Sequence, residues 1–121
     1  MNFPTISFKT TNAEVDGTLQ DLTEKKLEAL SKYIDAGAKI ICEVEFDKVT
    51  ASEKGQIFRV EVNLQVDGDL FRAEATRNSF EEGVDEVRNE LDKEMRRKRR
   101  KGMTLLKKGG RKLKDMMRFG K

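Results

Sequence analysis

Three segments in the middle of this chain alternate between apolar and polar residues, and this period of two constrains the fold more than any other feature. The alternating segments are 40–46, 58–66 and 71–76. Successive side chains of a strand point to opposite faces of a sheet, so each segment predicts a strand with one buried face and one wet face. Asp67 and Gly68 separate the second segment from the third, and this dipeptide is typical of a two-residue hairpin turn. We therefore predict an antiparallel meander that is covered on one side.

Two other segments repeat their apolar residues with the period of an α-helix. The first is predicted from Thr18 to Ile34, with a cap at Asp16 or Thr18, and the second is predicted to begin near Ser79. Their apolar stripes consist of Leu19, Leu22, Leu27, Leu30, Tyr33 and Ile34 in the first, and Phe80, Val84, Val87, Leu91 and Met95 in the second. Gly83 lies inside the second helix, where it predicts a close packing contact.

A short strand is also predicted before the first helix, from Thr5 to Lys9. The order of elements is therefore strand, helix, three strands, helix. Because one face of the sheet is polar, both helices are expected to cover the other face, which makes a two-layer α+β domain with a four-stranded sheet. We expect this domain to occupy residues 1–101. Residues 102–121 are expected to form a basic, flexible C-terminal tail that is too short to fold alone.

Composition excludes several classes of enzyme. The chain has no histidine, which removes the commonest general base and the commonest metal ligand. Its one cysteine, Cys42, lies in an apolar run and is interpreted as a buried core residue. The carboxylates considered for catalysis or metal binding are Glu43, Glu45, Asp67, Asp69, Asp85 and Asp92. We interpret them as solvated charges and expect no enzyme activity, cofactor, metal or small-molecule substrate. A nuclease that uses carboxylates and a metal is the enzyme alternative.

Charge is divided unevenly along the chain. From Met1 to Asp92 there are 11 basic and 20 acidic residues, a net charge of −9. From Lys93 to Lys121 there are 14 basic and 2 acidic residues, a net charge of +12, and residues 96–101 are all cations. Such an asymmetry predicts a polyanionic partner, and nucleic acid is favoured because lysine and arginine replace the counterions condensed on phosphates. A membrane surface and a solvated charge run are the alternatives.

Membrane insertion and secretion are not indicated. No apolar run approaches the roughly 20 residues that span a bilayer, and the first residues lack a charged region followed by an apolar stretch. We therefore expect a cytoplasmic protein without a membrane partner. The tail contains scattered apolar residues such as Leu105, Leu106 and Phe119. We interpret them as incidental, with a short amphipathic anchor as the alternative.

Three local patterns, taken in order, resemble one protein family. They are LQDLTEKKLEALSKYI at 19–34, KVT at 48–50 and SFEEGVDEVRNELDKEMRRKRRK at 79–101. Together with the order of elements, they are similar to the ribosome hibernation-promoting factors, also called ribosome-associated inhibitors. Val84 and Asp85 fall where that family has Ile-Asp, and Leu91 falls at its leucine position. The resemblance covers about residues 5–101.

The resemblance implies a β-α-β-β-β-α fold similar to a double-stranded-RNA-binding domain. It also implies binding to the small ribosomal subunit and its ribosomal RNA, in the channel used by messenger and transfer RNA, which blocks translation in idle ribosomes. The RNA contacts that it implies by position are Lys26, Lys93, Arg97 and Arg99. The long form's C-terminal dimerisation domain has no counterpart here, so pairing of ribosomes through that domain is not predicted. We expect a monomer.

Charge alone adds further candidate RNA contacts. On the second helix and its extension these are Arg88, Arg96, Lys98, Arg100 and Lys101, and in the tail they are Lys107, Lys108, Arg111 and Lys112. A general RNA- or DNA-binding module with a basic C-terminal arm is the alternative function.

Overall fold

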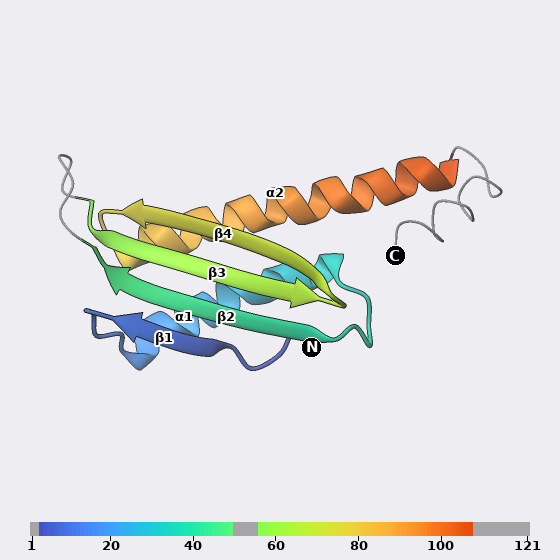
Figure 1. The fold of residues 1–121 in the computed structure, drawn as a ribbon. Helices are drawn as coiled ribbons and strands as arrows, with labels where there is room; N and C mark the ends of the chain where they lie inside the picture. The colour runs from blue at the N-terminus through green and yellow to red at the C-terminus, as the bar shows by residue number, and fades with distance from the viewer. Residues whose placement is uncertain (1–2, 50–55, 108–121) are drawn as a thin grey trace.

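The computed structural model describes residues 3–49 and 56–107, the last eight of them through their backbone alone. The elements follow the predicted order (Figure 1). They are β1 (Ser7–Thr11), α1 (Gly17–Glu28), the 3₁₀-helix η1 (Ala29–Tyr33), β2 (Ile40–Lys48), β3 (Phe58–Val66), β4 (Asp69–Arg77) and α2 (Phe80–Lys107).

The four strands form one sheet in the order β1-β2-β3-β4. The predicted meander is confirmed, since β2 pairs antiparallel with β3 and β3 with β4. Asp67 and Gly68 both have positive φ, at 50° and 92°, as a two-residue type I′ turn requires. β1 pairs parallel with β2, because the connection through α1 returns the chain in the same direction. β1 begins two residues later than predicted, at Ser7.

Both helices cover the same face of the sheet, as predicted from the polar character of the other face (Figure 1). The inward residues of the strands pack against the predicted stripe of α2, and all five of its members are buried: Phe80, Val84, Val87, Leu91 and Met95. Cys42 belongs to this core at 2% exposure, and burial raises the pKa of its thiol to about 12. The thiol therefore stays protonated and acts as a packing residue.

The first helix differs from the prediction at its end. Asp16 is its cap, because the Asp16 Oδ1 atom accepts a hydrogen bond of 2.9 Å from the Leu19 amide. The α-helix ends at Glu28 rather than continuing to Ile34, and the chain tightens into η1. A 3₁₀-helix turns about 120° per residue instead of about 100°, so side chains after Glu28 point in directions that an α-helical wheel does not give.

The second helix begins under a cap from Ser79, whose Oγ accepts from the Glu82 amide at 3.1 Å. An ideal Cβ added at Gly83 would lie 2.7 Å from Cγ2 of Val60, so the predicted close contact is confirmed. The helix continues through Lys107, six residues beyond the predicted domain boundary, and its C-terminal part extends past the sheet (Figure 1). The remaining part of the predicted tail, residues 108–121, lies outside the described residues.

Candidate nucleic-acid interface

Cations gather along the line where α1 and η1 meet α2. We call this line the interhelix seam. Its members are the cations Lys26, Lys32, Arg88, Arg96 and Arg99 and the carboxylates Asp85 and Asp92. Residues of α2 at spacings of three and four share a helix face, which places Arg88, Asp92, Arg96 and Arg99 toward the first helix.

Asp92 lies at the centre of the seam. Its Oδ1 atom accepts a hydrogen bond of 2.6 Å from the Tyr33 hydroxyl and one of 2.9 Å from Nε of Arg96. Its Oδ2 atom lies 3.9 Å from NH1 of Arg88. The Tyr33 hydrogen bond is the first cause that lowers the pKa of Asp92, with Arg96 next among the favourable partners. The same hydrogen bond raises the pKa of Tyr33. The Asp92 carboxylate is therefore ionised and surrounded by donors from both helices.

Two further contacts cross the seam. Nζ of Lys26 lies 2.7 Å from Oδ1 of Asp85, and NH1 of Arg99 donates to the carbonyl oxygen of Tyr33 at 3.4 Å. Both side chains of the Lys26–Asp85 pair are at least one-third exposed, so the pair contributes little to stability. A lysine in such a pair exchanges its carboxylate for a phosphate at small cost.

The other predicted contacts on α2 lie away from the seam. Lys93 is 3.9 Å from Glu90 on the outer side of the helix. Lys98 forms an ion pair of 2.7 Å with Asp69 and lies over the ring of Phe71, so it faces the β3–β4 turn. Arg97 is exposed beside the same turn. The structure therefore brings together only part of the predicted set on one line.

The last predicted residues are placed by the backbone or not at all. Arg100, Lys101 and Lys107 lie on the final turns of α2. Lys108, Arg111 and Lys112 lie outside the described residues. Their contacts with RNA stay predictions.

Sequence reasoning missed Lys32 as a seam residue. Lys32 is close enough to Asp92 to contribute to the lowering of that carboxyl's pKa, and its Nζ lies 5.3 Å from the centre of the Tyr33 ring. On an α-helical wheel Lys32 lies about 120° from Lys26, whereas the tighter turn of η1 reduces this separation to about 40°. No sequence pattern in this segment indicated the change from an α-helix to a 3₁₀-helix.

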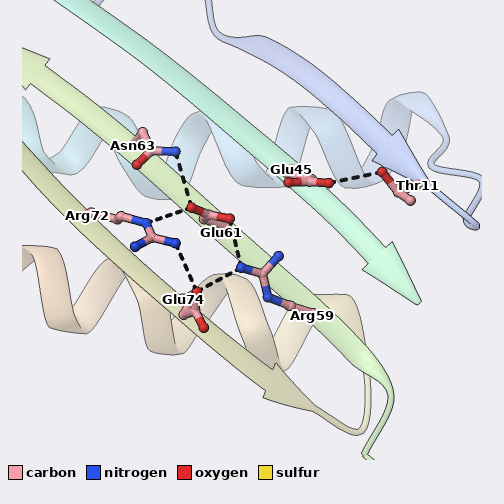
Figure 2. Close-up of polar contacts among 7 residues, drawn as sticks. All are labelled: Thr11, Glu45, Arg59, Glu61, Asn63, Arg72 and Glu74. Carbon is pink, nitrogen blue, oxygen red and sulfur yellow. Dashed lines mark hydrogen bonds and ion pairs between the residues drawn. The ribbon is translucent and has the colours of Figure 1, made fainter. Parts of the chain in front are cut away.

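The open face of the sheet has the opposite character. Glu45, Glu61 and Glu74 lie directly opposite one another across β2, β3 and β4. Figure 2 shows how Arg59 and Arg72 bridge Glu61 and Glu74, with nitrogen–oxygen distances of 2.7 to 3.3 Å. These hydrogen bonds lower the pKa of Glu61 and raise that of Arg59. The positive charges of both arginines are therefore paired with carboxylates of the same sheet face.

The balance of charge on this face is negative. Its carboxylates are Glu43, Glu45, Asp47, Glu61 and Glu74, and its cations are Lys9, Arg59 and Arg72. The hydroxyl of Thr11 donates to Glu45 at 3.0 Å (Figure 2). A polyanion is repelled by such a surface, so the sheet and the helices do not form one continuous positive surface.

Several carboxylates interpreted as solvated are engaged in contacts. Asp67 accepts a hydrogen bond of 2.8 Å from the Lys39 amide, and Asp69, Asp85 and Asp92 form ion pairs. In the described part of the chain, no three or more acidic or cysteine side chains are grouped so that they could hold a metal ion. Within the same part, no helix combines the length and the apolar character needed to cross a membrane.

Comparisons with known proteins support the fold described above. A family model described as Sigma 54 modulation protein / S30EA ribosomal protein matches residues 6–102. The N-terminal domain of Protein Y from Thermus thermophilus has a TM-score of 0.65 and 22% sequence identity, over 78% of this chain and 98% of that one. A ribosomal subunit interface protein from Coxiella burnetii has a TM-score of 0.60 and 20% identity, over 78% and 96% of the respective chains. No curated protein matches the chain. The two solved structures confirm the predicted fold.

Proposed function

The chain belongs to the Sigma 54 modulation protein / S30EA ribosomal protein family, as its resemblance to hibernation-promoting factors predicted, and from this premise we propose that it binds the ribosome and holds it inactive. The binding partner is the small subunit, through its ribosomal RNA. One structural neighbour, from Coxiella burnetii, is named as a ribosomal subunit interface protein, which supports the ribosome as the partner.

The observation that carries the proposal is the separation of charge between the two layers. The seam and residues 96–99 of α2 present cations, whereas the open face of the sheet presents an excess of carboxylates. Lysine and arginine on a helix surface replace the counterions of RNA phosphates, and this term supplies most of the affinity of such proteins. RNA therefore approaches from the helix side, and the sheet faces away from it.

This orientation fits a protein that fills a channel. The two helices lie on one side of the sheet with cations between them, and α2 continues past the sheet (Figure 1), so the helix side can face an RNA wall. In the small subunit, the channel for messenger and transfer RNA is lined by RNA, so a bound chain excludes both ligands. The proposed action is occupancy by a monomer in the cytoplasm, without a catalytic step.

Sedimentation through a sucrose gradient tests this proposal. We expect the chain to migrate with isolated small subunits, and an excess of transfer RNA with a messenger fragment should displace it. Large subunits serve as the control, because they expose RNA but lack the channel. A chain that stays at the top of the gradient contradicts the proposal.

A general RNA-binding module gives a different result in the same assay. Such a module binds a duplex RNA as tightly as small subunits at equal salt, because phosphate contacts do not depend on sequence. Equal affinities for the two would replace the ribosomal proposal with this alternative.

A further inference from the structure

We propose that Asp92 is a positioning residue, which holds Arg88 and Arg96 in the seam so that the two guanidinium groups receive one RNA phosphate. Tyr33 fixes Asp92 in turn. The inference rests on the proposed function, because it assigns a part of the same RNA-binding surface.

The contacts of Asp92 come from both sides of the seam. Arg88, Asp92 and Arg96 lie on successive turns of α2, four residues apart, so one carboxylate lies between two guanidinium groups. The Asp92 side chain is only 19% exposed, whereas those of Arg88 and Arg96 are 31% and 49% exposed. The carboxylate therefore lies beneath the two cations, and their outer surfaces face solvent.

Arg88 has an unfilled hydrogen-bonding capacity. Its Nε atom is buried and has no acceptor among the described residues, and its NH1 atom is 3.9 Å from Asp92. Buried donors in folded proteins nearly always have partners. A phosphate between Arg88 and Arg96 supplies acceptor oxygens to the exposed part of the Arg88 side chain, which is 31% exposed, whereas the buried Nε gains a partner only if the side chain shifts toward solvent.

A carboxylate in a phosphate-binding surface weakens phosphate binding unless it also orders the groups that bind the phosphate. Its charge repels the phosphate, so charge alone predicts that removing it strengthens RNA binding. However, arginine side chains that Asp92 already holds in place lose less conformational freedom on binding than unrestrained side chains would. The anchor from Tyr33 gives Asp92 one fixed position, because the 2.6 Å bond joins η1 to α2 across 59 residues of sequence.

The two effects have opposite signs, which makes the inference testable. Asp92→Ala removes one negative charge together with the contacts to Arg88 and Arg96. Glu90→Ala removes one negative charge from the outer side of the same helix, where Glu90 contacts Lys93 at 3.9 Å. We measure the dissociation constant of each full-length variant for isolated small subunits at one salt concentration.

We expect Glu90→Ala to bind about twofold more tightly, because the interaction of a single exposed charge contributes only a small free energy. We expect Asp92→Ala to bind about fivefold more weakly, because two long side chains must then be ordered on binding. Tighter binding of Asp92→Ala, by a factor like that of Glu90→Ala, would overturn the inference while leaving the proposed function intact. A wild-type chain that does not bind small subunits would overturn the proposed function itself.

Tyr33→Phe gives an independent test if Asp92→Ala is poorly folded. It leaves the net charge and the ring unchanged and removes only the hydroxyl that anchors Asp92. We expect binding to weaken about twofold, because the entropic cost of ordering about one side chain is then paid on binding. Unchanged binding would count against the inference.

Tyr33 also provides a spectroscopic readout, because it is the only tyrosine in a chain without tryptophan. Ultraviolet titration of the wild-type phenol is expected to show a pKa above the ordinary value of 10.0, and Asp92→Ala should return it toward that value. An identical titration in both proteins would show that the anchor is absent in solution and would overturn the inference.

Discussion

The two halves of α2 share one helical geometry and differ in what holds them. Residues 80–95 place an apolar stripe against the sheet, from Phe80 to Met95, and all its members are buried. Residues 96–99 are exposed cations, and the backbone continues as a helix to Lys107 past the sheet. The inner half is fixed by burial, whereas the described side chains of the outer half, residues 96–99, make exposed contacts such as those of Lys98 with Asp69 and of Arg99 with the Tyr33 carbonyl oxygen.

The buried inner half of α2 allows the outer half to carry a dense positive charge. Like charges four residues apart destabilise an isolated helix, so the run of cations at 96–101 is unfavourable for helix formation by itself. The inner half supplies the stability through its contacts with the sheet. We propose that residues 80–95 mainly supply stability and that the cations from Arg96 onward supply much of the RNA binding, together with the seam residues Lys26 and Arg88.

Removing charge from the outer half is expected to have the largest effect. The triple change Arg96→Gln, Arg97→Gln, Arg99→Gln should weaken binding to small subunits by about 100-fold, because three charged hydrogen-bond donors are lost. The midpoint of thermal unfolding should stay within a few degrees, because these side chains are exposed.

A matched control is available for this change. Lys9→Gln, Lys39→Gln, Lys48→Gln removes the same net charge from exposed positions on or near the sheet. Equal losses of affinity in the two triple variants would show that net charge, and not the outer half of α2, controls binding.

A change in the inner half should have the reverse profile. Leu91 is fully buried, so Leu91→Ala is expected to lower the free energy of unfolding by about 2–5 kcal/mol. Denaturant titration measures this loss. The fraction that remains folded should bind small subunits with wild-type affinity. A loss of affinity in this folded fraction would contradict the separate roles of the two halves.

Gly83→Ala tests how closely the inner half packs. Alanine favours a helix by about 1 kcal/mol over glycine, yet its Cβ would lie 2.7 Å from Val60. We expect a net destabilisation of about 1–2 kcal/mol, since overpacking a core costs more than the helix gains. Gly17→Ala is the control, because a Cβ there meets nothing within 4 Å. Stabilisation at both sites would contradict the close contact.

The smallest expected effect concerns pH and the Tyr33–Asp92 bond. The folded pKa of Asp92 is lowered, so its contribution to stability is present above the ordinary value of 3.8 and is lost as pH falls through the folded value. The pKa of Tyr33 is raised, so its contribution is present below 10.0 and is lost as pH rises through the folded value. The difference in the free energy of unfolding between wild type and Tyr33→Phe should therefore be largest between pH 3.8 and pH 10.0 and should decrease outside this range. A difference that does not change with pH would contradict the bond.

The fold was largely predictable because its signals are local. Alternation fixed β3 at residues 58–66 as observed, and the stripe of α2 identified its buried face. Two errors came from contacts that are distant in sequence. β1 is positioned by its pairing with β2, and η1 ends where the Tyr33 hydroxyl meets Asp92.

The candidate interface was less predictable than the fold. The family resemblance indicated Lys26 and Arg99, and charge added Arg88 and Arg96; the structure places all four in the seam. It could not separate them from Lys98, which an ion pair of 2.7 Å with Asp69 holds toward the β3–β4 turn. Such pairings depend on tertiary geometry, which the order of charges along a chain does not contain.

The salt dependence of binding to small subunits tests the central account most directly. For about six phosphate contacts, the logarithm of the association constant should fall with the logarithm of salt concentration with a slope of about −4 to −5. The triple variant at Arg96, Arg97 and Arg99 should flatten this slope by about 2 to 3, because three contacts are lost. A wild-type slope near zero, or the same slope in both proteins, would contradict the account.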